Sequence, residues 1–453
     1  MSQDNLSENN LVLIKEKLSS GTYSQISRML NKLHPNDIAR FIESSPPSDR
    51  EFVWQILDKE IEGEVLNQLP NSLQEDFLED MEASEVLEIT ETLEPDEIAD
   101  IIQRLPEAVI EEVLSAMSAQ NRERLEQVLS YPEDSAGGLM NTDVIVVRRS
   151  PTLDVVLRYL RIQGNFPSTT DKIFVVSRKN EYKGFIHLNQ LLISDPSLHV
   201  EDIYTKDSEA IQVITSDINV ARIFEKDDLI SAPVVDSANQ LLGRITIDDV
   251  VDVIREEATE DFLRMAGAGK DREILLKSSW ENAKARLPWL FASWIGGIVA
   301  ASIIGAFENM LANIVALAAF IPVILGMGGN IATQSSTIIV RGMATGRVNI
   351  GGEIKLIFKE IKVGLILGSL YGILLGVFAK FAFTNAPDNL GFVVGLSICA
   401  SMIVAATVGT IIPLILRKLD IDPAIATGPF VTTSIDILGV LFYFLIAGIF
   451  LRI

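Results

Sequence analysis

Cysteine and histidine are scarce in this sequence of 453 residues, which contains one cysteine and three histidines. Because Cys399 has no second cysteine as a partner, an intrachain disulfide and a cluster of thiolate metal ligands are both excluded. The three histidines, His34, His187 and His199, do not have the spacing of metal ligands. These shortages rule out a disulfide scaffold and argue against a zinc enzyme.

Other catalytic signatures are missing as well. The sequence pairs no nucleophile with a base and has no glycine-rich phosphate-binding loop, so we expect that the protein is not an enzyme. Its first ten residues, MSQDNLSENN, are polar and lack the basic and then apolar pattern of a cleaved signal peptide. We therefore expect the N-terminal half to remain in the cytosol.

Charge is unevenly distributed along the chain, whose net charge is -23. After residue 282, eleven Lys and Arg stand against seven Asp and Glu, which leaves about -27 on residues 1–282. Such an acidic half repels nucleic acid and anionic lipid but attracts divalent cations. We expect no nucleic-acid partner. The alternative for most of these acids is a solvated surface without a ligand.

Five long apolar runs occupy the C-terminal half, uncharged except for one acid in the fifth, and about 20 apolar residues suffice to cross a bilayer. They cover residues 287–307, 311–340, 363–379 (extended by 381–383), 390–416 and 423–451. The pattern predicts a transmembrane domain of five α-helices at 283–453. Lys and Arg cluster before the first run, between the second and third, and between the fourth and fifth. This bias places the N-terminal half in the cytosol and the C-terminus outside the cell membrane.

Asp436 is the only acid in the fifth run. A carboxylate at this depth is costly in hydrocarbon, so it normally faces a protein interior or an aqueous path. Hydroxyl residues at 432–434 complete an all-oxygen environment, which suits a hard cation such as magnesium. A proton relay or a structural hydrogen bond is the alternative. Asp422, about 21 Å away along a continuous helix, is either a pore residue or a helix N-terminal residue beside Pro423.

The second run contains residues that weaken a helix. Pro322, Gly326, Gly328, Gly329 and Asn330 lie near its middle. Proline removes a backbone donor and glycine loosens the helix, so we expect an interrupted backbone whose carbonyls line a cavity together with the Asn330 amide. The alternative is that the glycines only allow the helices to pack closely.

Residues 1–132 are predicted to form short amphipathic helices separated by prolines. The segment LHPNDIARFI at 33–42 recurs as LEPDEIADII at 93–102, which predicts a superhelix of stacked helical hairpins. Residues 133–258 contain two tandem β-α-β-β-α units, at about 133–200 and 201–258.

The second of these units has a turn that suits a nucleotide. Gly243, Thr246 and Asp249 are spaced to hold a ribose and phosphates, whereas the first unit has Gly184, His187 and Gln190 instead. The first unit therefore departs from the pattern that suits a nucleotide.

An acidic helical link follows this pair. Its acids recur every three or four residues, so their carboxylates share helix faces and repel one another. Divalent cations would relieve that repulsion between domains or subunits, which makes the link a candidate switch set by the cytosolic cation concentration. A solvated acidic helix is the alternative. The acids are Asp248, Asp249, Asp252, Glu256, Glu257, Glu260 and Asp261.

This order of parts resembles the MgtE family of magnesium transporters over essentially the whole chain. The motif PVILGMGGN at 322–330 and the pattern from Asp422-Pro-Ala to Thr-Thr-Ser-Ile-Asp436 match the membrane motifs of that family. The resemblance identifies the tandem units as CBS domains and residues 259–282 as a connecting (plug) helix.

The resemblance implies a homodimeric, magnesium-selective channel with its pore between the subunits. It implies that a hydrated magnesium ion sits at Asp436, and we assign Asp422 and Asn330 to the same pore. Magnesium bound to cytosolic acids would draw the domains together and close the pore, and an adenine nucleotide, ATP, would bind the CBS pair. The implied sensing residues are Asp96, Asp100, Asp228, Asp249, Asp252, Glu257, Glu260 and Asp261.

Two other functions stay open at this point. A transporter of the same build for cobalt or manganese would use the same oxygen ligands. A membrane-anchored nucleotide sensor would use the five helices only as an anchor. Asp436 beside a broken second span argues against the sensor, because an anchor needs neither feature.

Overall fold

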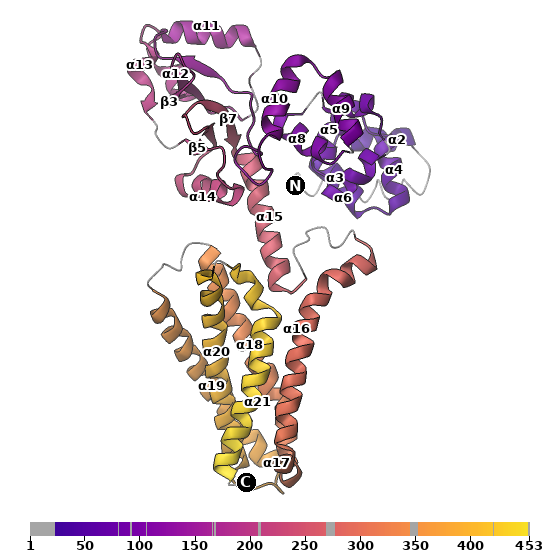
Figure 1. The fold of residues 1–453 in the computed structure, drawn as a ribbon, viewed down its shortest axis with the longest axis vertical. Coiled ribbons are helices and arrows are strands. Elements are labelled where there is room, and N and C mark those ends of the chain that lie inside the picture. Colours follow the sequence, from indigo (N-terminus) through magenta and orange to yellow (C-terminus); the bar gives the residue numbers. More distant parts are fainter. Residues whose placement is uncertain are drawn as a thin grey trace. The chain divides into compact units, whose positions relative to one another are not determined.

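Short helices, an α/β region and long apolar helices follow one another along the chain, as the predicted multidomain fold requires (Figure 1). The computed structural model describes residues 23–79, 81–90, 93–105, 107–164, 166, 169–206, 210–268, 277–344, 352–419 and 421–451. It divides into two units, Met1–Arg255 and Glu256–Ile453. Part of the predicted connecting segment, residues 269–276, lies outside the described residues.

The N-terminal domain is entirely helical in its described part. Helices two apart in sequence pack on each other, with α3 on α5, α5 on α7 and α7 on α9, which is the arrangement of stacked hairpins. The predicted repeat appears as α3 and α8, and both begin with a proline at the first helical position. The helices are α2 (Tyr23–Leu30), α3 (Pro35–Ser44), α4 (Pro47–Gln55), α5 (Lys59–Asn67), α6 (Asn71–Glu79), α7 (Ala83–Thr90), α8 (Pro95–Gln103), α9 (Glu107–Ala116) and α10 (Ala119–Leu129).

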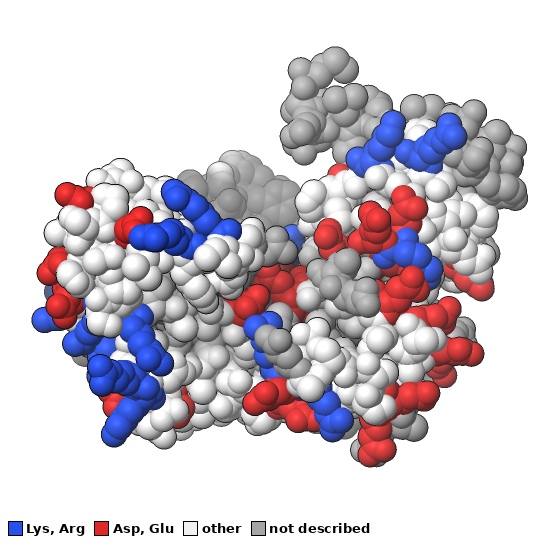
Figure 2. All heavy atoms as spheres, turned by 90° about the horizontal axis from the view of Figure 1, so that it is seen from above, with Lys and Arg blue, Asp and Glu red and all other residues white. Residues whose placement is uncertain are grey.

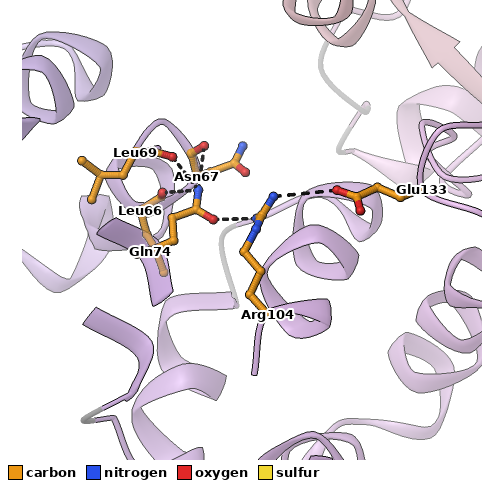
Figure 3. Close-up of polar contacts among 6 residues, drawn as sticks. All are labelled: Leu66, Asn67, Leu69, Gln74, Arg104 and Glu133. Atoms are coloured by element: carbon orange, nitrogen blue, oxygen red, sulfur yellow. Dashed lines mark hydrogen bonds and ion pairs between the residues drawn. The ribbon is translucent and has the colours of Figure 1, made fainter. Parts of the chain in front are cut away.

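A polar contact joins successive layers of this domain (Figure 3). The buried Gln74 amide donates to the carbonyls of Leu66 and Leu69, each at 2.8 Å. Arg104, at the end of α8, donates to the Gln74 side-chain oxygen at 2.6 Å and lies 3.9 Å from a carboxylate oxygen of Glu133. Because a buried amide must be satisfied, this contact fixes the turn after α5 against α8 and the segment that follows α10.

The α/β region has two small sheets that share a three-strand pattern, and β4 adds a fourth strand, antiparallel to β3, to the first sheet. In each, a parallel pair is followed by an antiparallel pair, β1-β2-β3 in the first and β5-β6-β7 in the second. The elements are β1 (Val146–Arg148), α11 (Leu153–Gln163), β2 (Lys172–Val176), β3 (Tyr182–His187), α12 (Leu188–Ile193), α13 (Val200–Ile203), β4 (Thr205–Lys206), β5 (Ile211–Gln212), α14 (Asp217–Asp227), β6 (Ser231–Val235), β7 (Leu241–Thr246) and α15 (Ile247–Met265).

The internal repeat extends to single residues. The register irregularity of the antiparallel pair follows Val175 in the first sheet and Val234 in the second, 59 positions later. Asn180 and Asn239, again 59 apart, both have positive φ and donate reciprocally, to the carbonyls of Leu241 and Tyr182 at 3.2 and 3.1 Å. The prediction of two tandem units is confirmed.

The segment between α10 and β1 packs on the second unit. Ala136 and Met140 are buried in the core of that unit. The Asn141 amide donates to the Arg244 carbonyl at 2.8 Å, and the Arg244 amide donates back at 2.9 Å. The segment that follows the helical domain in the sequence therefore contacts the second unit, although the first unit comes next along the chain. This contact brings the end of the helical domain close to β7 and α15.

Five helices are long and apolar enough to cross a membrane, as predicted. They run side by side in Figure 1, and α20 packs on α18, α19 and α21. Their bounds are α16 (Ser279–Ala306), α18 (Ala316–Ala344), α19 (Glu353–Ala382), α20 (Leu390–Lys418) and α21 (Pro429–Leu451), with α17 (Glu308–Asn313) and the 3-10 helix η1 (Pro423–Thr427) between them. Lys355, Lys359 and Lys362, expected in a loop, lie on the first turns of α19.

Two local expectations are wrong. α18 is a continuous helix although Pro322 lies inside it, so the predicted break is absent from the described residues 316–344. Helix is favoured because a backbone polar group has no other partner in hydrocarbon. In contrast, the fifth run is divided, since η1 ends before Pro429 starts α21. Asp436 is therefore about 10 Å along α21, and the 21 Å helical path from Asp422 does not exist.

Glycines bring α19 and α20 into backbone contact. A Cβ atom added at Gly372 would lie 2.5 Å from the Gly395 carbonyl oxygen, and one at Gly376 would lie 2.6 Å from that of Gly391. Both distances are too short for any side chain. Gly364 and Gly368 continue the same stripe toward the N-terminal end of α19. Glycines that allow helices to pack closely, the alternative considered for the second span, are thus found between α19 and α20, the third and fourth spans.

Candidate cation sites

The first acidic site lies where the helical domain meets the second CBS-type unit. Asp96, in the first turn of α8, is only 7% exposed, and within the described residues its Oδ1 atom accepts no hydrogen bond. Burial raises the pKa of Asp96 well above its usual range, and the nearby charge of Asp249 raises it further. An orphaned, buried carboxylate oxygen of this kind suits a cation.

Asp249 stands on the other side of this site, in the first turn of α15. Burial and then the charge of Asp248 raise the pKa of Asp249 to about 7. Thr246 opposes the shift, because its hydroxyl donates to Asp249 Oδ2 at 2.9 Å. The two predicted sensing acids Asp96 and Asp249, 153 positions apart in sequence, therefore act on each other directly.

Sequence reasoning misses two further acids of this site. Glu94 and Glu97 form a capping box at the start of α8, and both raise the pKa of Asp96. Burial raises the pKa of Glu97 itself. The capping-box spacing, with Pro95 at the first helical position, was the available signal. The structure thus gathers more negative charge around Asp96 than the sequence indicates.

Polar contacts bound this site on one side. The side-chain amide of Asn141 donates to a Glu94 carboxylate oxygen, and Arg124 of α10 donates to Asp143 at 3.4 Å. These four residues line a cavity of about 170 Å³ between α8, α10 and the segment before β1. In the view of Figure 2, acidic side chains are dense over the right-hand part of the surface.

The other predicted sensing residues of this unit lie farther out. Asp100 is partly exposed, one turn along α8 from Asp96. Asp228 is exposed at the end of α14, in the left-handed conformation. Asp252 is exposed on α15 and accepts from Arg255 at 3.3 Å. The structure brings Asp96 and Asp249 together with Glu94 rather than with these three.

The raised pKa of Asp249 predicts a dependence of stability on pH. Its carboxyl ionises near 3.8 in the unfolded chain and near 7 in the folded one. As pH rises the unfolded state loses this proton first, so the free energy of unfolding falls between about pH 4 and pH 7 and stays low above. Without divalent cations, we expect the melting temperature at pH 8 to be about 5 °C or more below that at pH 5.5.

Scanning calorimetry of the purified full chain measures this effect. Asp249→Asn should reduce the difference between the two pH values, and the raised pKa values of Asp96 and Glu97 should preserve the remainder. Magnesium should raise the melting temperature chiefly at pH 8. Glu43→Gln, which changes an exposed acid of α3, is the matched control and should leave the difference unchanged. The same pH dependence in Asp249→Asn as in the wild type would contradict the assignment.

The second acidic site is at the end of α15, in the unit of the long helices. Burial and then the charge of Asp261 raise the pKa of Glu257, and Glu260 adds to the effect. Burial and then the charge of Asp422 raise the pKa of Asp261. Predicted sensing and pore residues thus meet at one place, which sequence spacing does not indicate.

Asp422 has two roles at this place. Its Oδ1 atom accepts from the Ala424 amide at 2.8 Å and so caps η1. Its Oδ2 atom accepts from Arg264, which also donates to Glu260. Of the two interpretations of Asp422 in the sequence, the helix N-terminal one is seen in the structure.

Asp436 lies within the group of long helices. It follows Ile435, which is buried against Gly328 of α18, and precedes Gly439, whose added Cβ atom would lie 3.3 Å from Ser401 of α20. Asp436 itself is only partly buried. Asn330, in contrast, is exposed on α18. Within the described residues, Asp436 therefore stays partly accessible and Asn330 stays exposed.

Among the described residues, no group of three or more His, Cys, Asp and Glu side chains converges to hold a bare metal ion. The acids fit a different mode of binding. Magnesium dehydrates reluctantly and is usually held through its water by one or two carboxylates. Asp96 with Asp249, and Glu257 with Asp261, offer that donor set.

Comparison with known proteins decides the family. Profiles of three domain families match the chain: a divalent cation transporter domain (MgtE) over residues 321–446, the MgtE intracellular N domain over 33–134 and a CBS domain over 200–256. The magnesium transporter MgtE of Thermus thermophilus is 33% identical over 446 residues, which cover 97% of this chain and 98% of the relative. The chain belongs to the MgtE family of magnesium transporters.

Further relatives support the same conclusion. The MgtE magnesium transporter of Bacillus subtilis is 34% identical over 339 residues, which cover 75% of this chain and 74% of the relative. A crystal structure of the cytosolic domain of the Mg2+ channel MgtE in complex with ATP is 30% identical, with a TM-score of 0.50, and covers 54% of this chain and 99% of that chain. An MgtE-family protein is a membrane transporter with a cytosolic N-terminal part, rather than a member of an enzyme family.

Proposed function

We propose that this MgtE-family protein is a magnesium-selective channel of the cell membrane, which cytosolic magnesium closes by negative feedback. Asp436 supports the pore assignment most directly, because it is the only Asp or Glu of α21. It lies between Ile435, which packs against Gly328 of α18, and Gly439, which approaches Ser401 of α20. An acid inside a membrane helix bundle marks an ion path by default. A hydrated magnesium ion at Asp436 would keep most of its water.

A second copy of the chain completes the proposed pore. Pro322, Gly326 and Asn330 recur every four residues on α18 and share one exposed face. Among the described residues, no atom of another segment lies within 4 Å of a Cβ added at Gly326, so this face has room for a partner. We therefore infer a homodimer with the pore between subunits, lined by Asn330 and Asp436, and with Asp422 near its cytosolic mouth.

Closure is proposed to follow from the two acidic sites. Burial and then like charge disfavour ionised carboxylates at Asp96 and Asp249, and the raised pKa values of both residues support such a cost. Magnesium would offset that cost and hold the domains in contact. Glu257, Glu260 and Asp261 would respond in the same way at the end of α15. Asp100, Asp228 and Asp252 would act as outer ligands of the first acidic site. The bias of Lys and Arg in the loops supports a C-terminus outside the cell.

ATP is a further proposed ligand of the CBS pair. The similarity to an ATP-bound cytosolic domain supports it, together with Gly243, Thr246 and Asp249 on the second unit. Thr246 and Asp249 are already hydrogen-bonded to each other at 2.9 Å. Because Asp249 also belongs to the first acidic site, nucleotide and magnesium would act on the same carboxylate.

Magnesium uptake into liposomes that carry the purified protein tests the proposal. With an indicator inside, uptake should be fast when the side bearing the cytosolic domains holds little magnesium, and slow when it holds much. Cobalt and manganese, added singly, test the selectivity. Uptake of no ion under low-magnesium conditions would contradict the channel and favour an anchored nucleotide sensor.

A further inference from the structure

Arg264 links α15 to the start of the last membrane segment. Its guanidinium donates to Asp422 through one terminal nitrogen and to Glu260 through the other. The three side chains are 15, 28 and 17% exposed, respectively, so this is a largely buried group rather than a surface pair. Two carboxylates from different segments therefore share one cation that belongs to the chain itself.

The backbone at this junction is closely packed independently of the ion pairs. A Cβ added at Gly428 would lie 3.5 Å from the Met265 carbonyl oxygen, and one added at Gly267 would lie 3.3 Å from Pro429. Gly267 also has a φ of 69°, which favours glycine. The end of α15 is thus seated on the η1–α21 connection by shape as well as by charge.

The charges around Arg264 are predominantly negative. Glu257 and Asp261 lie close enough to act on Glu260 and Asp422, and Arg341 at the end of α18 acts on Asp261. Four acids therefore share this junction with two arginines among the described residues. The planar fork of Arg264 suits two carboxylates at once, which a lysine would not reproduce.

We propose that Arg264 is a built-in competitor of magnesium at this junction. Its guanidinium holds Glu260 and Asp422, and a divalent cation can use those carboxylates only after displacing it. By linkage, a group that occupies the same ligands raises the ion concentration needed for half-saturation. Arg264 thereby sets the magnesium concentration at which the α15–α21 junction responds. This inference rests on the magnesium gating proposed above.

Hydrogen–deuterium exchange of the full chain in detergent measures this competition. The quantity is the magnesium concentration that half-protects the amides of α15. For Arg264→Gln we expect this concentration to fall about fivefold or more, because an arginine fork on two carboxylates is removed. Arg264→Lys keeps the charge without the fork and should give a smaller fall.

Arg286→Gln is the matched control, since it removes an exposed arginine from α16 in the same unit. It should leave the concentration for half-protection unchanged.

The sign of the shift decides between competition and a purely structural role. If Arg264 only fastens the junction, its loss should raise the magnesium requirement, and that result overturns the proposal, as does an unchanged value. Should Arg264→Gln fail to fold, Arg264→Lys gives the same test, because competition predicts a lower magnesium concentration for half-protection and a structural role predicts a higher one. A wild type that magnesium never protects would contradict the gating itself. Protection of the wild type with no shift in the arginine variants would contradict only the competition.

Discussion

Magnesium uptake by liposomes that carry the Asp436→Ala variant is expected to fall below about a tenth of the wild-type rate. The reason is that α21 contains one ionisable acid, set about 10 Å from its start, and alanine leaves a passing cation without a charged ligand. Asp436→Asn keeps the shape and one oxygen but loses the charge, so it should also be strongly impaired. Asp436→Glu, which keeps the charge, should retain part of the uptake.

The control for this prediction is Asp388→Asn, which removes an exposed acid from the connection between α19 and α20. It should transport at the wild-type rate. Asp436 is only partly buried, so its loss should not prevent folding. All variants should therefore match the wild type in size-exclusion elution volume and in melting temperature. Wild-type uptake by Asp436→Ala would remove this residue from the ion path.

The second large effect is expected when Glu257, Glu260 and Asp261 are neutralised together, as Gln, Gln and Asn. Their carboxylates lie within one group at the end of α15, and burial together with mutual repulsion raises the pKa of Glu257 and of Asp261. With three negative charges removed, magnesium has little to bind there. We expect the cytosolic magnesium concentration for half-closure to rise about tenfold or more.

The matched control removes three charges elsewhere. Glu111, Glu112 and Glu123 are exposed on α9 and α10, and their triple replacement by Gln lowers the net negative charge equally. It should leave the closing concentration unchanged, within the small effect of screened surface charge. Equal shifts in the two triples would mean that total charge, rather than the end of α15, governs closure.

Much of the architecture follows from the sequence alone. Uncharged runs give five membrane helices because length and hydropathy are local properties, and the LHP and LEP segments give α3 and α8 because proline favours the first helical position. The two CBS-type units follow from repeated β-branched runs. The ends of the membrane helices are less predictable, since charged first turns such as those of α19 continue the helix beyond the bilayer core.

The sites are harder to predict because they depend on contacts between distant segments. Asp96 lies near Asp249 because the segment around Asn141, which precedes both CBS-type units in the sequence, packs on the second unit. Arg264 had no signal in the sequence, since its partner Asp422 is 158 positions away. The predicted break at Pro322 is wrong for the opposite reason. A proline disfavours helix locally, but in hydrocarbon the backbone polar groups have no partner outside a helix, so the helix continues.

The glycine stripe between α19 and α20 has a mechanical consequence. Side chains that interdigitate can exchange rotamers and let two helices slide, but carbonyls in contact with bare Cα atoms leave nothing to exchange. From Gly364 to Gly376, this hairpin therefore behaves as one stiff strut within the membrane. Any opening of the proposed path near Asp436 would therefore come from α16, α18 or α21 shifting against that strut, and not from the strut coming apart.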